Sequence, residues 1–122
     1  MPARQHRVTR GDDYRRIVRN GNRVGGAYCI THAVLHVPDD SEVRPARFGF
    51  IVSKAVGNAV TRNLVRRRLK TIADRRIAEG FAGADVVFRA LPASADAAFS
   101  ELEREVVRSL ERVLRSPVRG RT

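Results

Sequence analysis

The sequence lacks several features that would assign it to particular classes of protein. It holds one cysteine, Cys29, among 122 residues, which excludes an internal disulfide framework and any zinc site built from several cysteines. Its apolar runs are only a few residues long, whereas a membrane-spanning helix needs ~20 apolar residues, so we expect no membrane segment. The first ten residues contain three arginines and no apolar stretch. We therefore expect no secretory signal, and a cytoplasmic location.

The length and composition are those of one folded domain. Domains usually need ~100–150 residues, so 122 residues suffice for one domain and not for two. Hydrophobic residues make up 43% of the chain, and a disordered chain would hold fewer. We expect a single domain over residues 1–122, with its core over about 4–115 and a flexible tail at 116–122.

Positive charge is in large excess and is concentrated in two segments. Lysine and arginine number 24 against 13 acidic residues, a formal net charge of +11. Residues 1–23 hold seven basic and two acidic side chains, and residues 54–76 hold eight and one. Residues 77–122 hold seven of each. This clustering predicts a surface that binds a polyanion, with nucleic acid as the first candidate and an anionic membrane as the second.

The first half of the chain predicts a helix followed by two strands. Thr9 and Asp12 fit a capping box for a helix over residues 12–20, and Gly21 fits its end. β-Branched and aromatic residues then predict two strands joined as a hairpin across a polar loop, over residues 28–37 and 47–53 with the loop at 38–46.

The second half predicts a long helix, a strand and a final helix. The long helix covers about residues 59–79, the strand covers 85–90, and Ser94 is expected to cap the final helix. That helix carries one apolar stripe at helical spacing: Phe99, Leu102, Val106, Leu110, Val113 and Leu114. The order α-β-β-α-β-α indicates an α+β fold, an α/β sandwich with a small central sheet and packed helices.

The long helix combines an apolar stripe with an uncompensated cationic surface. Its predicted core-facing stripe consists of Val65, Leu69, Ile72, Ala73 and Ile77. Five cations occur between Arg62 and Lys70 without one acidic residue. A solvated helix usually mixes both signs to gain pairs along its surface, and like charges so spaced destabilise it. We interpret the surface as a binding site for a polyanion, against the alternative of a merely solvated basic face.

No set of residues in the sequence has the spacing of a catalytic or metal site. No nucleophile–base pair or carboxylate pair stands out, and His6, His32 and His36 lack the ligand spacing of a zinc site. His32 and His36 fall on one face of a predicted strand, and we expect them at the sheet surface. We therefore expect no catalytic residue, metal or cofactor on the protein.

An ordered set of motifs resembles the protein subunit of bacterial ribonuclease P. That family carries an Arg-Asn-Arg signature on a long basic helix, preceded by Gly-Asn-Ala-Val. This chain has Gly57-Asn58-Ala59-Val60, then Arg62-Asn63, then three arginines at 66–68. The flanking segments resemble the family in the same order, over roughly residues 4–115: DDYRRIVRNG at 12–21, FGFIVSK at 48–54 and DVVFRALP at 85–92.

Three positions depart from the family pattern. Leu64 replaces the second arginine of the signature, and Ala55 stands where many members have a second lysine. Val18 occupies a position that can be aromatic in the family. These departures concern individual contacts, whereas the whole ordered set of motifs carries the resemblance.

The resemblance implies a fold and an activity. The family fold has a left-handed βαβ crossover, which is rare among proteins. Ribonuclease P is an endoribonuclease that removes the 5′ leader from precursor tRNA, and its RNA subunit carries the chemistry with Mg²⁺. The protein is expected to bind that catalytic RNA and to hold the single-stranded leader in a cleft between the first helix and the sheet.

The resemblance also implies which residues make these contacts. The expected contacts to the catalytic RNA are Lys54, Asn58, Arg62, Asn63, Arg66, Arg67, Arg68 and Lys70. The expected leader cleft contains Tyr14, Val18 and His32, and Tyr14 is equally compatible with a core position beside Ile17.

Two other functions are compatible with the charge. A general RNA-binding or ribosome-associated protein, or an RNA chaperone, would share the charge and the fold class without needing the ordered motifs. A DNA-binding regulator would need a short partner helix before its recognition helix. A strand precedes the basic helix here, so we expect no DNA partner.

Overall fold

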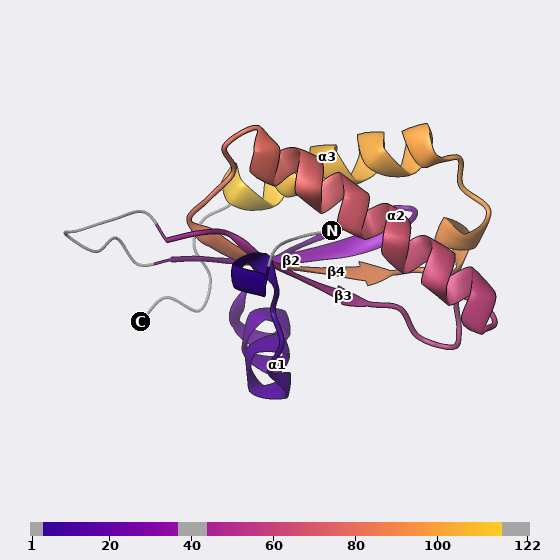
Figure 1. The fold of residues 1–122 in the computed structure, drawn as a ribbon, viewed down its shortest axis with the longest axis horizontal. Helices are drawn as coiled ribbons and strands as arrows, with labels where there is room; N and C mark the ends of the chain where they lie inside the picture. The colour runs from indigo at the N-terminus through magenta and orange to yellow at the C-terminus, as the bar shows by residue number, and fades with distance from the viewer. Residues whose placement is uncertain (1–3, 37–43, 116–122) are drawn as a thin grey trace.

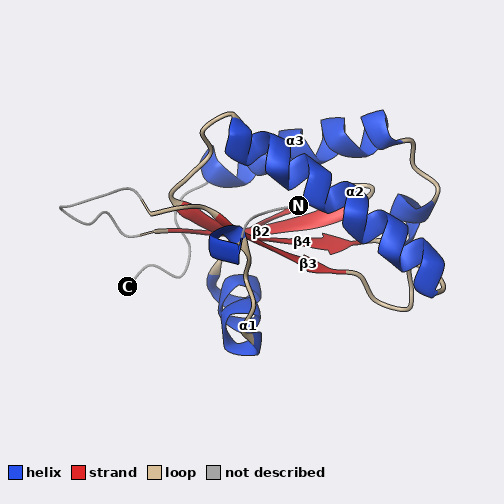
Figure 2. Ribbon diagram, in the orientation of Figure 1, coloured by secondary structure: helices blue, strands red, loops and turns tan. Residues whose placement is uncertain are grey.

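The computed structural model describes residues 4–36 and 44–115. Within them, a four-stranded sheet in the order β1-β2-β4-β3 forms the middle layer. Helix α1 lies alone on one face of the sheet, and α2 and α3 cover the other (Figures 1 and 2). The strands are β1 (Asn22–Gly25), β2 (Cys29–Leu35), β3 (Arg47–Ile51) and β4 (Ala84–Ala90). The helices are α1 (Gly11–Asn20), α2 (Ala59–Ala78) and α3 (Phe99–Arg115), with short 3-10 turns η1 (Arg4–His6) and η2 (Pro92–Ala95).

The α+β class is confirmed, but the predicted hairpin between the second and third strands is wrong. β2 pairs antiparallel with β1 and β4, while β3 pairs in parallel with β4 and makes an isolated parallel bridge to Arg7 through Phe48. β4 lies between β2 and β3, and all of its residues except Arg89 are buried. A nearly continuous apolar strand needs cover on both faces and therefore takes an interior position. β3, α2 and β4 thus form a βαβ unit, whose left-handedness stays a prediction.

Strand β1 was not predicted from the sequence. Its four residues have no regular alternation, and the chain turns at once into β2, with the Gly26 N–H donating to the Cys29 carbonyl at 2.9 Å. The carboxylate of Glu105 on α3 accepts the N–H groups of Ala27 and Tyr28 in the same turn, the latter at 2.7 Å. A contact from a distant helix therefore stabilises a hairpin that local propensity does not specify.

Both predicted side-chain caps at helix starts differ from the structure. Arg10, not Thr9, is the N-cap of α1, and its side chain makes no capping bond. Asp12 and Asp13 in the first turn interact favourably with the helix dipole instead. Ser94 lies in η2, where its hydroxyl donates to the Leu91 carbonyl at 2.6 Å, and α3 begins only at Phe99. The predicted end of α1 at Gly21 is confirmed.

The larger core fills the space between the sheet and helices α2 and α3. Both apolar stripes predicted for these helices face it, with Ile77, Phe99 and Leu114 only partly buried at its margin. Phe48 and Phe88 stack in this layer with their ring centres 5.7 Å apart. A second, smaller cluster lies under α1 on the other face and buries Val8, Ile17 and Val87. Most of the predicted loop at 38–46 and the predicted tail at 116–122 lie outside the described residues.

Candidate nucleic-acid interface

Helix α2 begins at a side-chain cap. The side-chain Oδ1 of Asn58 accepts the Thr61 N–H at 2.9 Å, which satisfies one of the free donors of the first turn. Val65, Leu69, Ile72 and Ala73 are fully buried, so they fix which side of α2 faces the sheet. The remaining side of the helix is therefore presented away from the core.

The cations of α2 divide into a free group and a neutralised group. Among the described residues, none of the five cations from Arg62 to Lys70 pairs with a carboxylate, and Arg67 is exposed. Farther along the helix, Arg75 pairs with Glu103 at 2.7 Å and lies over the Phe99 ring. Arg76 pairs with Glu79 at 3.1 Å. Excess positive charge is thus confined to the first part of α2.

We call this surface the basic face. It consists of most of the residues predicted to contact catalytic RNA: Lys54, Asn58, Arg62, Asn63, Arg66, Arg67 and Lys70. Two of its arginines are held in place by neighbours on the same segment. Arg62 donates from Nε to the Gly57 carbonyl at 3.1 Å, and Arg66 donates from Nη1 to the Asn63 side chain at 3.2 Å. These bonds orient the guanidinium groups.

Arg68, the remaining residue of that predicted set, has a role inside the protein. Its Nη1 donates to the Ala97 carbonyl at 2.8 Å and ties α2 to the segment before α3. Leu64, in contrast, leaves the core. Leu64 is 37% exposed, and Val60, one turn earlier, is 78% exposed. An apolar pair is thus exposed on the helix that carries the basic face.

The residues predicted for the leader cleft all belong to the side of the sheet that α1 covers. Tyr14 and Val18 pack around the cluster of Val8, Ile17 and Val87. His32 on β2 lies directly opposite Val87 in the sheet, so both side chains point to this side. The Tyr14 hydroxyl oxygen accepts the Phe50 N–H at 3.2 Å. Tyr14 is half-buried, and this hydrogen bond fixes it to the sheet.

His32 is not at the sheet surface, as the sequence suggested, but buried. Its exposed fraction is 3%, and neither ring nitrogen has a hydrogen-bond partner among the described residues. Burial lowers the pKa of His32, and the nearby charges of Arg23 and Arg89 lower it further. Its imidazole is therefore neutral at pH 7, with one donor and one acceptor nitrogen.

Arg23 and Arg89 are exposed cations on the same side of the sheet, and the sequence did not single them out. Arg89 was detectable as the one charge after the apolar run of β4. Arg23 was hidden because strand β1 was not predicted. We call this second surface the α1 face, and it consists of Tyr14, Val18, Arg23, Ile30, His32, Ile51 and Arg89.

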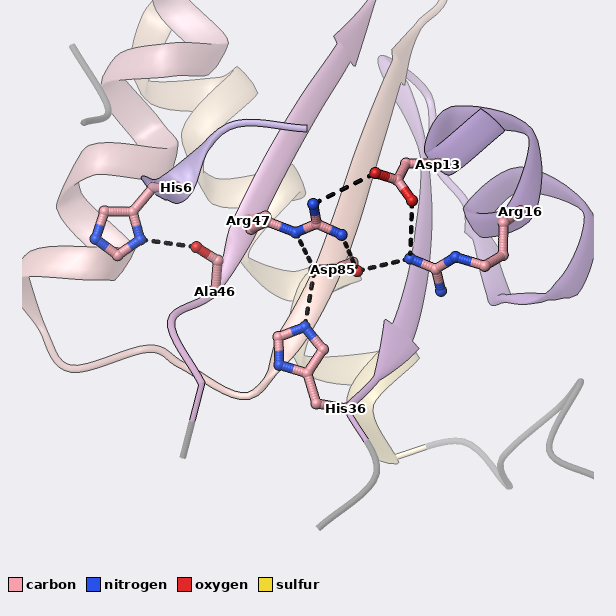
Figure 3. Close-up of polar contacts among 7 residues, drawn as sticks. All are labelled: His6, Asp13, Arg16, His36, Ala46, Arg47 and Asp85. Carbon is pink, nitrogen blue, oxygen red and sulfur yellow. Dashed lines mark hydrogen bonds and ion pairs between the residues drawn. The ribbon is translucent and has the colours of Figure 1, made fainter. Parts of the chain in front are cut away.

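A cluster of charged side chains joins α1 to one end of the sheet (Figure 3). Asp85 of β4 has its side chain 3% exposed and accepts hydrogen bonds from Arg16, His36 and Arg47. Burial alone would raise the pKa of Asp85, but these three donors outweigh it and hold the pKa well below its usual range. His36, expected at the sheet surface, is mostly buried in this cluster.

Three further properties bear on the class of protein. In residues 4–36 and 44–115, no three His, Cys, Asp or Glu side chains gather in a way that could hold a metal ion. No helix in the same ranges is long and apolar enough to cross a membrane. Burial raises the pKa of the Cys29 thiol to about 12, so this thiol stays protonated at neutral pH.

The fold and the two surfaces define an α+β nucleic-acid-binding protein. A model of the ribonuclease P family matches residues 1–114 of the chain. A ribonuclease P protein component from Clavibacter michiganensis is 46% identical over 116 residues, covering 95% of this chain and 99% of the relative. One from Nocardioides is 42% identical, covering 93% and 95%. The chain therefore belongs to the ribonuclease P protein family.

Solved structures agree with this assignment. A Staphylococcus aureus RNase P protein mutant is 26% identical with a TM-score of 0.71, covering 89% of this chain and 85% of that one. The RNase P protein from Thermotoga maritima has a TM-score of 0.73 at 20% identity, covering 88% and 96%, and shows the fold alone. The chain is thus a protein subunit of a ribonucleoprotein endoribonuclease, whose partner is the ribonuclease P RNA and whose catalysis is carried by that RNA.

Proposed function

We propose that this subunit binds two RNA elements on two separate surfaces: the catalytic RNA on the basic face and the single-stranded 5′ leader of precursor tRNA on the α1 face. The observation that carries the proposal is the distribution of unpaired charge. The cations of the basic face have no acid partners among the described residues, and Arg23 and Arg89 extend positive charge onto the other side of the sheet. Phosphate groups of RNA would neutralise the unpaired cations on both surfaces.

On the basic face, arginine side chains bind phosphates of the catalytic RNA. The guanidinium group suits this task because its planar set of donors matches phosphate oxygens. Asn58 lies at the start of α2, where the helix dipole favours an anion, and Lys54 lies in the turn before it. The Asn58 side chain already caps the helix, so its expected contribution is to fix the first turn for such a contact.

On the α1 face, the groups suit one strand of RNA with its bases unpaired. Arg23 and Arg89 neutralise leader phosphates, while His32, buried and neutral, lies beneath this surface without presenting a ring nitrogen to it. Tyr14 stacks on a base with the side of its ring that faces away from the sheet. Such stacking is worth ~1–3 kcal/mol per base.

The protein acts by binding, not by cleaving. We propose that the Mg²⁺ needed for hydrolysis is held by the RNA subunit. Since the relatives are bacterial proteins, we propose that the subunit works in the cytoplasm, where precursor tRNA is made.

Leader binding is tested with the reconstituted holoenzyme. Its dissociation constants are measured for precursor tRNA with leaders of increasing length and for mature tRNA. We expect tighter binding as the leader grows over the first nucleotides, and loss of that gain in R89A. R108A, which removes an exposed cation from the charge-balanced helix α3, serves as the matched control. Equal affinity for precursor and mature tRNA would favour a general RNA-binding role.

A further inference from the structure

We propose that Asp85 is a positioning residue for the α1 face: through Arg16 it holds α1 in one place on the sheet and so sets where Tyr14 and Val18 stand relative to His32. The proposal rests on the proposed leader binding. Asp85 lies in the charged cluster of Figure 3, on the side of the sheet that α1 covers.

The Asp85 carboxylate makes a full set of hydrogen bonds. Oδ1 accepts from His36 Nε2 at 2.8 Å and from Arg47 Nε at 3.0 Å. Oδ2 accepts from Arg47 Nη2 and from Arg16 Nη2, both at 2.8 Å. Arg47 thus grips the carboxylate with two parallel bonds, a geometry that fixes orientation as well as distance.

Two hydrogen-bonded links in this cluster join the sheet to α1. In one link α1 provides the cation, and in the other it provides the acid. Arg16 of α1 donates to Asp85 of β4, while Arg47 of β3 donates from Nη1 to Asp13 of α1 at 3.4 Å. Each crossing therefore joins a cation on one element to an acid on the other. A helix held to the sheet by these two separate links resists sliding and rotation.

The apolar contact beneath α1 is too small to fix the helix by itself. Ile17 is the only residue of α1 that is fully buried, and the cluster around it contains three buried side chains among the described residues. Apolar contact stabilises in proportion to buried area and has no preferred direction. The hydrogen bonds of the charged cluster are directional, so they fix the orientation of α1, which a small apolar contact cannot.

The test uses three variants in the holoenzyme. R16M cuts the link from Asp85 to α1 but leaves Arg47 and His36 on the carboxylate. D85N removes the charge that all three donors share. R15M is the matched control, because Arg15 lies on the same helix, is 64% exposed and, within the described ranges, pairs only with Asp12. Circular dichroism and thermal unfolding first identify any variant that does not fold.

We expect R16M and D85N to weaken binding of leader-bearing precursor on the order of tenfold, which corresponds to about 1.4 kcal/mol. Affinities for mature tRNA and for the catalytic RNA should not change, nor should any affinity in R15M. The double variant should lose no more than D85N alone, because D85N already breaks the link that R16M removes. Hydrogen exchange of the α1 amides should accelerate in R16M and D85N only.

Two outcomes would overturn the proposal. If R16M weakens leader binding while D85N preserves or strengthens it, Arg16 contacts the leader directly and Asp85 does not position it. If both variants bind leader normally and keep slow exchange in α1, Ile17 and Tyr14 place the helix unaided. If the wild-type holoenzyme binds precursor tRNA no more tightly than mature tRNA, the proposed function is contradicted. Hydrogen exchange of the α1 amides would still decide whether Asp85 anchors α1.

Discussion

The ring of Tyr14 lies directly against the backbone of Gly49. A Cβ atom at residue 49 would come within 2.6 Å of the Tyr14 Cε1 atom, and within 2.8 Å of its hydroxyl oxygen. The contact brings α1 close to β3 and lets the hydroxyl reach the Phe50 N–H. Tyr14 therefore has a structural role in docking α1, in addition to the base contact proposed for it.

Substituting Gly49 tests this close approach. We expect G49A to lower the free energy of unfolding by ~1–3 kcal/mol, because the added methyl group must displace the tyrosine ring. Urea unfolding monitored by circular dichroism measures the change. G25A is the matched control, since a Cβ there meets no atom within 4 Å. Equal stability of G49A and the wild type would show that the ring moves freely.

Removing one cation from the basic face should weaken assembly with the catalytic RNA. We expect R67A to lower the affinity and to reduce the slope of log K against log salt by about 1, because one phosphate contact is lost. The measurement is a binding titration at several salt concentrations. R108A should keep the wild-type slope. An unchanged slope in R67A would remove Arg67 from the interface.

Restoring the family arginine at position 64 should not harm RNA binding. Leu64 is partly exposed on the helix that carries the basic face, so an arginine there can reach solvent or phosphate without a cavity in the core. We expect L64R to bind the catalytic RNA as tightly as the wild type or more tightly. A clear loss of affinity in L64R, with L64A unaffected, would mean that the longer side chain clashes in the interface.

The stability of the fold should depend on pH through His32. Its pKa in the folded state lies below the unfolded value of ~6.5, so the unfolded chain takes up a proton first as the pH falls. His32 therefore costs no stability above about pH 6.5 and destabilises the fold progressively below it. We expect H32Q to lose less stability than the wild type between pH 7 and pH 5 in urea unfolding. Parallel losses in both proteins would contradict this.

The sequence predicted what depends on local pattern. Helical spacing alone predicts two features of the long helix: its uncompensated cations and its apolar stripe of Val65, Leu69, Ile72 and Ala73. The partner of each strand was not visible, since β4 enters between β2 and β3 from 33 residues beyond β3 in the chain. Pairing over that distance depends on burial of the whole sheet and not on neighbouring residues.

The second surface was harder to predict for the same reason. Asp85, Arg47 and Arg16 come from three elements, and only the fold brings them together. His32 was expected at the sheet surface because it shares a strand face with His36, whereas in the fold it is buried. Tyr14, Val18 and His32 were assigned to one surface through the family resemblance, and the structure places them on one side of the sheet.

The central claim is that this chain assists a catalytic RNA in removing the 5′ leader. The direct measurement mixes the purified protein with a bacterial ribonuclease P RNA at low Mg²⁺ and follows cleavage of 5′-labelled precursor tRNA. We expect little cleavage by either component alone, and efficient cleavage at the mature 5′ end when both are present. Tight binding of the protein to the RNA without any stimulation of cleavage would contradict the account.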